Sequence, residues 1–331
     1  MVKPGGAKPK AGRAPGAGAG APPAPDLRVT IAGLELQNPV LSASGTFGYA
    51  FEFQDHMDLN RLGAIVVKTV TLKPRAGNPP HRIVETPAGM LNSIGLQNVG
   101  IDRFIAEKLP RLRRLRPPLI VNIAAESAEE FCELAKRLSD QEGVRALELN
   151  ISCPNVAGGL DFAIDPVLTS RVVGAVRRVT TLPLIPKLSP NVTDITVIAR
   201  AAAEAGADAI SMINTFIAMA IDVRTCRPKI AMGTAGLSGP AIRPIAVRMV
   251  WQVARAVGVP VIGMGGIATA EDALEFLIAG ATAVAVGTAN FVDPATPVKL
   301  VDGIGAFVAE QRLSSVRELI GSVQLPPRGQ A

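Results

Sequence analysis

The segment Glu148-Leu149-Asn150-Ile151-Ser152-Cys153-Pro154-Asn155 changes from an apolar strand pattern to a polar turn within a few residues. The apolar run begins at Val144, and the proline and asparagine at the end of the segment are residues that stop strands. A loop with Gly158 and Gly159 follows and has the composition of a mobile flap. A strand end that leads into a flexible loop is a frequent position for an active site on a rigid scaffold.

Cys153 follows this strand end and has two interpretations. A free cysteine is usually a small buried residue that takes no part in chemistry. A thiol on a mobile loop beside an active site can instead serve as a nucleophile or a general base. Of the other cysteines, Cys132 lies in a helical pattern that favours core packing, and Cys226 lies in the long segment 216–239 and is assigned no role. Cys153 is therefore the candidate catalytic residue.

The same strand pattern recurs along the chain, each time ending in a small or polar cluster. The eight apolar runs cover 38–41, 64–67, 119–121, 146–149, 184–186, 209–213, 259–262 and 283–286. Helical patterns alternate with them at 99–115, 127–141, 165–180, 193–205, 240–258 and 269–280. Ser127 and Thr269, each followed by acidic residues, predict two of the helix starts.

Near-continuous apolar strands that alternate with helices indicate an α/β fold with a parallel sheet covered on its outer face. Eight such units favour a closed (β/α)8 barrel, or TIM barrel, over an open sheet, because closure leaves no exposed strand edge. The segment 73–98 is too long for an ordinary connection and predicts a hairpin inserted after the second strand. A second long segment, 216–239, predicts a short excursion near the barrel mouth, and 294–323 predicts closing helices.

Composition bounds the domain organisation. Residues 1–25 consist almost entirely of Gly, Ala, Pro, Lys and Arg, which predicts a disordered tail before a catalytic domain at 26–331. This tail holds four basic residues and no acid before position 26, so it accounts for most of the formal net charge of +6. The remaining charge is too small to indicate a nucleic-acid-binding face.

Several other classes are also disfavoured by the sequence. No apolar run reaches the roughly 18 to 20 residues of a membrane span, and the absence of a signal-peptide pattern predicts a cytoplasmic protein. Three cysteines without a C-x-x-C pair argue against a disulfide framework, an iron–sulfur cluster or a structural zinc site. Two histidines make a His-based triad or a poly-His metal site improbable.

In a parallel barrel the carboxyl ends of the strands converge on one mouth, which holds the site. Here that mouth is expected to present asparagines and lysines without a carboxylate: Ser44, Lys68, Thr69, Asn122, Asn150, Cys153, Lys187, Asn214 and Thr215. Such a rim suits a flat, anionic, amide-rich ligand rather than a hard metal cation.

The last two strand ends carry glycines instead of polar side chains. Gly263, Gly265 and Gly266, together with the helix start at Thr269, offer backbone N–H groups after the seventh strand, and Gly287 and Thr288 do so after the eighth. Barrels commonly hold a phosphate at this place. Glycines in tight turns for steric reasons alone remain the alternative.

The two lysines at strand ends also allow a structural interpretation. Lys68 and Lys187 are costly to bury without an anionic partner, and they could bridge carboxylates inside the barrel. No acid stands at a matching strand end in the sequence, so ligand binding is favoured. A lysine that forms a Schiff base, as in a barrel aldolase, is a further possibility from a different reaction class.

With these residues in place, the chain resembles the class 1 dihydroorotate dehydrogenases, flavin barrel enzymes of pyrimidine synthesis, from about Leu27 to Ile320. The resemblance rests on segments 42–45, 67–71, 148–155, 212–215, 237–244 and 263–267. The inserted segment 77–98 is similar to the NAD-linked class 1B subfamily in particular. A cysteine at the position of Cys153 separates class 1 from the membrane-associated class 2, which has serine there.

The resemblance implies that the protein oxidises (S)-dihydroorotate to orotate for UMP synthesis, with hydride transfer to FMN and Cys153 as the base. It implies FMN binding by Ser44, Lys68, Thr69, Asn122, Asn150, Lys187, Ile213, Gly239, Gly265, Gly266, Gly287 and Thr288. It implies substrate binding by Lys68, Asn92, Ser93, Ile94, Gly95, Leu96, Asn150, Asn214 and Thr215. The sequence departs from the family pattern at Val99, Ala157 and 216–218, which affects the flap and the partner surface more than the chemistry.

The class 1B resemblance also implies a partner. Members of that subfamily pass electrons to NAD through a second subunit that carries FAD and a 2Fe-2S cluster, and this chain has neither cluster ligands nor a dinucleotide fingerprint of its own. We therefore expect a heterotetramer with a homodimer of this chain at its core. The alternatives are a dihydropyrimidine dehydrogenase-type flavin barrel acting on uracil or thymine, the aldolase, and a non-catalytic scaffold subunit.

Overall fold

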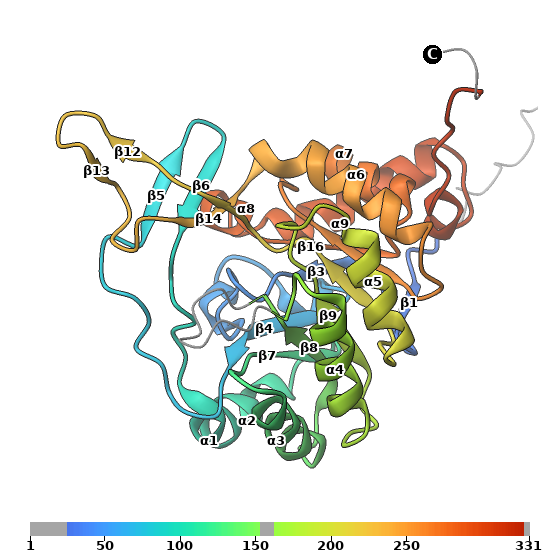
Figure 1. Cartoon of the computed structure of the whole chain (residues 1–331). Coiled ribbons are helices and arrows are strands. Elements are labelled where there is room, and N and C mark those ends of the chain that lie inside the picture. The colour runs from blue at the N-terminus through green and yellow to red at the C-terminus, as the bar shows by residue number, and fades with distance from the viewer. Residues whose placement is uncertain (1–24, 153–161, 328–331) are drawn as a thin grey trace, which may run out of the picture.

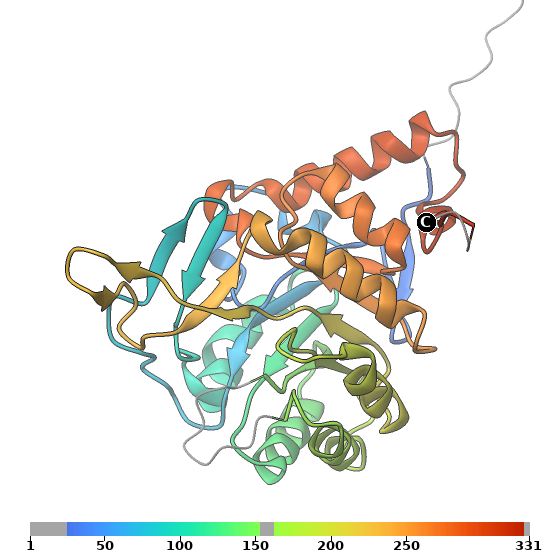
Figure 2. The same cartoon turned by 45° about the horizontal axis from the view of Figure 1, so that its top comes forward.

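The eight predicted strands form one closed parallel sheet in the computed structural model, which describes residues 25–152 and 162–327 (Figures 1 and 2). The strands lie in the order β3-β16-β15-β10-β9-β8-β7-β4. A parallel bridge between Leu41 and Ala64 joins the two ends of the series. Their bounds are β3 (Val40–Ser42), β4 (Ile65–Val70), β7 (Leu119–Ile123), β8 (Val144–Asn150), β9 (Leu184–Lys187), β10 (Ile210–Met212), β15 (Val261–Met264) and β16 (Ala283–Val286). The prediction of a TIM barrel is confirmed.

Helices cover the outside of this sheet (Figure 1). The helices after the third to seventh barrel strands match their predicted patterns: α3 (Ala128–Ser139), α4 (Pro166–Arg177), α5 (Ile195–Glu204), α6 (Arg243–Ala254) and α7 (Ala270–Ala279). The predicted helix starts are confirmed, since the Ser127 side chain accepts from the Glu130 amide and Thr269 forms a reciprocal capping box with Asp272. The chain closes with α8 (Ala289–Val292), α9 (Thr296–Glu310) and a 3-10 turn, η5 (Val316–Leu319).

The helix predicted at 99–115 is interrupted. It consists of α1 (Gly100–Arg103), a π-helical segment, η3 (Phe104–Lys108), and α2 (Leu109–Leu112). Pro110 is the second residue of α2, has no N–H to donate and crowds the carbonyl four residues before it. The wider π turn directly before the proline accommodates this defect.

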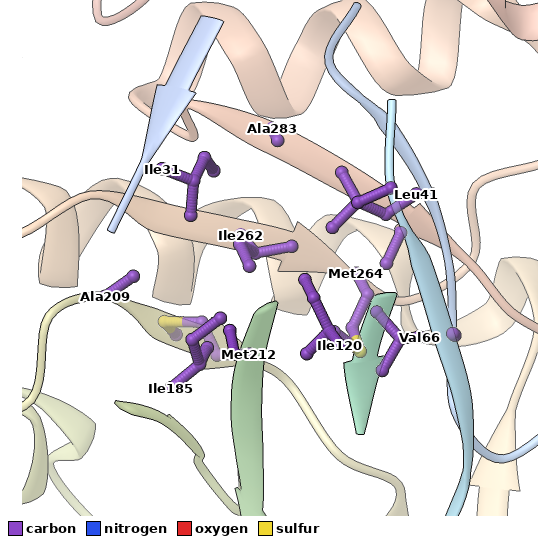
Figure 3. Close-up of a cluster of buried hydrophobic side chains, with 14 of the residues drawn as sticks. Ile31, Leu41, Val66, Ile120, Ile185, Ala209, Met212, Ile262, Met264 and Ala283 are labelled. Atoms are coloured by element: carbon purple, nitrogen blue, oxygen red, sulfur yellow. The ribbon is translucent and has the colours of Figure 1, made fainter. Parts of the chain in front are cut away.

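The barrel interior is built in layers by the alternation of side chains along each strand. A lower layer is apolar and includes Ile120, Ile185 and Ile262, which Figure 3 shows in one buried cluster. Two residues further along the first two of these strands stand Asn122 and Lys187. The same alternation therefore places apolar side chains in the interior nearer the amino ends of the strands and polar side chains in the next layer towards their carboxyl ends.

A hairpin near the amino terminus completes the lower end of the core. It consists of β1 (Val29–Ile31) and β2 (Leu34–Leu36), and its residues Ile31 and Leu36 are each 1% exposed. Figure 3 draws Ile31 in the same cluster as Ile262 and Ala283 of the barrel. This hairpin was not predicted, because each strand has only three residues.

We expect Ile31→Ala to lower the free energy of unfolding by about 2–5 kcal/mol, because it leaves a cavity in a packed layer. Chemical denaturation followed by circular dichroism measures this loss. Ile217→Ala is the matched control, since the Ile217 side chain is 57% exposed and its truncation leaves no cavity. Equal, small losses for both variants would contradict a packing role for the hairpin.

Both long insertions join a single accessory sheet at one side of the barrel (Figures 1 and 2). Its strands are β5 (Ile83–Thr86), β6 (Gly89–Asn92), β14 (Ala235–Ser238) and β11 (Phe216–Ala218), in the order β11-β14-β6-β5. The predicted hairpin in 73–98 is confirmed as β5–β6. The segment 216–239 is more than the expected excursion, because β14 pairs with β6, and its tip forms a small ribbon of β12 (Ile221–Asp222) and β13 (Arg227–Pro228).

No helix in the described part of the chain is long and apolar enough to cross a membrane. The predicted tail at 1–25 falls, except for Pro25, outside the described residues, as does Cys153.

Candidate active site

A cavity of about 730 Å³ opens where the barrel strands end and the accessory sheet begins. Strand ends supply one part of its wall, and β6, β14 and the segment after β6 supply another. The cavity brings together almost all the predicted site residues: Ser44, Lys68, Thr69, Asn92, Ser93, Ile94, Gly95, Leu96, Asn150, Lys187, Ile213, Asn214, Thr215, Gly239, Gly265, Gly266, Gly287 and Thr288. Asn122 is instead fully buried and does not line the cavity, and Cys153 lies outside the described residues.

The cavity wall is cationic. Among its described lining residues there is no aspartate or glutamate, whereas Lys68, Lys187, Arg75 and Arg82 all contribute to it. Arg75 pairs with Glu126 at 2.9 Å. Arg82 donates to the Gln97 side chain at 2.6 Å and to a backbone carbonyl, and it has no ion pair with a described carboxylate. An anionic ligand would therefore find free positive charge here.

Neither arginine was assigned to the site from the sequence. Both lie in the inserted segment 73–98, and their approach to the cavity depends on how that segment folds over the barrel. The available signal was Arg82 itself, a basic residue directly before β5 with no acid beside it in sequence.

Lys68, on β4, is half-buried, and this burial lowers the pKa of its ammonium group. The positive charge of Arg82 lowers the pKa further, and Glu52 opposes both effects. An anionic group beside Lys68 would relieve the desolvation and the repulsion together. The environment of Lys68 thus favours an anion at this place.

Lys187 is the exception to the predicted absence of acids. Its Nζ lies 4.0 Å from a carboxylate oxygen of Glu148 and 3.3 Å from the Ser44 hydroxyl. The expectation that no acid faces the strand-end lysines is therefore wrong for Lys187. Glu148 precedes Asn150 by two residues on β8, so it points into the barrel one layer below the strand end. Because residues two apart on a strand face the same side, the sequence did contain a signal for Glu148. The prediction missed it because it considered only the last residue of each strand.

Asn122 lies in the same buried layer. Its Nδ2 donates to Glu148 Oε2 at 2.5 Å, which fixes the orientation of the amide. Its Oδ1 is buried without a hydrogen-bond partner among the described residues. An unpaired buried acceptor costs about 1–3 kcal/mol, so a ligand that donates a hydrogen bond to Asn122 would remove that cost.

The asparagines at the other strand ends form a connected set. Asn214 Nδ2 donates to Asn150 Oδ1 at 3.4 Å, and Asn214 Oδ1 accepts from the Thr215 backbone amide at 2.9 Å. Asn191, which was not predicted, donates to the Thr215 carbonyl at 3.0 Å and accepts from the Ile217 amide at 2.9 Å. It thereby ties the segment after β10 to the loop after β9.

The glycine end of the cavity offers backbone donors. Gly265 and Gly266 have φ angles of +129° and +79°, which side chains rarely adopt, and a Cβ on Gly266 would stand 2.8 Å from a carbonyl oxygen. The N–H groups of these glycines, and of Gly287 and Thr288, donate to no other residue that the structure describes. Four free donors at one end of a cavity suit an anion.

The start of α7 does not add to these free donors, contrary to expectation. The amides of Ala268 and Thr269 both donate to Asp272 Oδ2 at 2.9 Å, so the capping box uses them. Arg243 in turn forms an ion pair with Asp272.

A (β/α)8 barrel with a cationic, amide-rich cavity at its carboxyl mouth and free backbone donors at the last two strands has the arrangement typical of barrel enzymes that bind phosphorylated ligands. Comparison with known families gives a narrower assignment. A family model described as dihydroorotate dehydrogenase matches residues 26–308. The chain belongs to the dihydroorotate dehydrogenase family.

Individual relatives agree with this assignment. The chain is 57% identical to a protein of Geotalea daltonii named dihydroorotate dehydrogenase B (NAD(+)), catalytic subunit. The match extends over 302 residues, which is 91% of this chain and 99% of the relative. Proteins of the same name from Desulforudis audaxviator and Geobacter sulfurreducens are 57% and 56% identical, over 89% and 91% of this chain and 96% and 99% of the relatives. The predicted class 1B resemblance is confirmed, and the pyrimidine-reducing, aldolase and scaffold alternatives are not favoured.

Proposed function

We propose that this chain is the FMN-dependent catalytic subunit of a class 1B dihydroorotate dehydrogenase, which oxidises (S)-dihydroorotate to orotate in UMP biosynthesis. One observation carries the proposal: the residues that the resemblance assigns to cofactor and substrate, scattered from Ser44 to Thr288, all line one cavity except the buried Asn122, in a chain of this family. Residues 26–331 would then be the catalytic domain. A cytoplasmic location is part of the same proposal, and cell fractionation tests it.

The residues present fit FMN. The backbone donors of Gly265, Gly266, Gly287 and Thr288 suit its phosphate, since free N–H groups favour an anion. The buried Oδ1 of Asn122 lacks a donor, and the NH-bearing ring of a flavin has one. Ser44, Thr69, Asn150, Lys187, Ile213 and Gly239 complete the proposed set.

FMN, when bound, supplies the acceptor for the hydride from C6 of dihydroorotate. The chain's own residues bind and orient the substrate. Lys68 would attract its carboxylate, and the other polar residues of the proposed set would position its ring amides: Asn92, Asn150, Asn214 and Thr215. The segment Ser93, Ile94, Gly95 and Leu96 closes the same part of the cavity and would exclude water.

Cys153 would remove the proton from C5 as general base. It lies outside the described residues, so its support is its place in the sequence. It directly follows Ser152, which lines the cavity and whose hydroxyl donates to the Lys187 carbonyl at 3.3 Å.

Anaerobic titration of the purified chain with dihydroorotate tests the proposal through the visible absorption of the flavin. Bleaching by dihydroorotate but not by dihydrouracil is expected. If the protein is yellow and dihydrouracil bleaches it instead, the substrate is a pyrimidine of the uracil class and not dihydroorotate. A colourless protein that does not take up added FMN would refute the proposal.

A partner subunit is the second part of the proposal. The relatives are named as catalytic subunits of NAD(+)-linked enzymes, which supports a partner that carries FAD and a 2Fe-2S cluster. We propose a heterotetramer with a homodimer of this chain at its core. The isolated chain should then oxidise dihydroorotate slowly with NAD, and rapid NAD reduction by the chain alone would contradict the arrangement.

A further inference from the structure

Glu148 is a buried carboxylate for which the proposed mechanism has no use. It is 2% exposed and lies below the cavity rather than in its wall. Its partners come from three other strands, the two neighbours β7 and β9 and the next strand, β10. Asn122 Nδ2 donates to it at 2.5 Å, Ser211 Oγ donates at 2.8 Å, and Lys187 Nζ lies 4.0 Å away.

Its position in the barrel is unfavourable for a charge that serves packing alone. Its register partner on β9 is the buried Ile185, and the buried Ile120 stands two residues before its register partner Asn122 on β7. An apolar side chain at 148 would join these apolar neighbours. Replacement of a buried ion pair by well-packed apolar residues is often neutral or stabilising. The carboxylate therefore needs another explanation than stability.

Two of its partners are residues that we propose to hold FMN. By accepting from the Asn122 amide, Glu148 leaves Asn122 Oδ1 as the free acceptor. By facing Lys187, it offsets the charge of an ammonium group that is 6% exposed and lies in the cavity wall. The carboxylate thus controls both the direction of an acceptor and the net charge at one place.

We infer that Glu148 is a positioning residue that sets the reduction potential of bound FMN through Lys187 and Asn122; this rests on the proposed function of the cavity. Reduced FMN carries more negative charge than oxidised FMN. A lysine without its counter-ion would favour the reduced form, because charges in a poorly hydrated interior interact strongly. Glu148 therefore keeps the potential lower than Lys187 alone would make it.

The test is Glu148→Gln, which removes the charge, keeps the volume and retains one oxygen that can accept from Asn122 or Ser211. We expect the affinity of reduced FMN relative to oxidised FMN to rise about tenfold, which is a potential about 30 mV higher. A reference-dye titration measures this potential without any substrate. Glu133→Gln, on the exposed face of α3, is the matched control and should leave it unchanged.

The double variant Glu148→Gln/Lys187→Met separates charge from shape. It restores local neutrality, so its potential should return towards that of the wild-type protein. A purely structural role predicts instead that the double variant stays displaced from the wild-type potential at least as far as Glu148→Gln. An unchanged potential in Glu148→Gln, or a double variant that shows no return towards the wild-type potential, would overturn the inference.

Thermal unfolding of the FMN-free chain gives a readout that is independent of the cofactor. Each single variant should lower Tm, because it leaves one buried charge unpaired. The double variant should regain at least half of that loss, and an additive loss would show that the pair is not coupled. Since neither measurement uses dihydroorotate, a wrong substrate assignment and a wrong role for Glu148 give different results.

Discussion

Replacing Cys153 with alanine is expected to slow the reduction of bound flavin by dihydroorotate about 10²- to 10⁴-fold, the usual contribution of a positioned general base. The proton on C5 of the substrate must leave as the C6 hydride departs, and no other thiol, histidine or carboxylate of the described part of the chain lines the cavity. Stopped-flow absorbance under anaerobic conditions measures the rate. FMN content should stay at the wild-type level, since the proposed cofactor set does not include Cys153.

The two other cysteines provide the controls for this experiment. Cys132 is half-buried in α3 and does not line the cavity, and burial raises the pKa of its thiol, which favours the protonated form that cannot accept a proton. Cys226 is exposed at the tip of the β12–β13 ribbon. Alanine at either position should leave flavin reduction unchanged. Near-normal reduction by Cys153→Ala would show that the base is another group.

The sequence predicted the barrel because its signals are local. Each strand is an apolar run that ends in a polar or small residue. At the helix starts, the capping residues Ser127 and Thr269 bond to residues three positions later in the chain. The same locality explains the success at the mouth, since the polar residue that ends a parallel strand lies at the site in any barrel. Lys68, Asn150 and Lys187 were found in this way.

Features that depend on long-range contacts were not predictable in this way. The accessory sheet requires Asn92 to pair with Gly236, 144 positions later, and the local sequence around either residue does not predict this pairing. The role of Glu148 depends on partners from three other strands. The break at η3 was predictable in principle, because Pro110 stands within the helical pattern.

The capping box of α7 illustrates a different limit. A helix start beside a glycine turn is a frequent anion site, so the expectation at Thr269 was reasonable. Asp272 satisfies the same amides from within the helix, and the ion pair with Arg243 holds it there. When a side chain of the helix itself accepts from these N–H groups, they are not available to bind a phosphate. The free donors remain on Gly265, Gly266, Gly287 and Thr288, which no side chain caps.

Lys68→Met is expected to weaken orotate binding about 10- to 150-fold, the range for the loss of a hydrogen bond to a charged group. The effect should also depend on pH. Burial and Arg82 lower the pKa of Lys68 from its ordinary value of 10.5, and only the protonated lysine attracts the carboxylate. In the wild-type protein, affinity is therefore present below this pKa and is lost as pH rises through it, earlier than an ordinary lysine would allow.

The measurement is the dissociation constant of orotate between pH 7 and pH 10, taken from the change in the flavin spectrum at full FMN occupancy. Lys68→Met should bind weakly over the whole range, without the alkaline loss. Lys73→Met, an exposed lysine in the adjoining segment, should keep both the affinity and the pH profile of the wild-type protein. If Lys68→Met retained the alkaline loss, the titrating group would have to be another cation of the cavity.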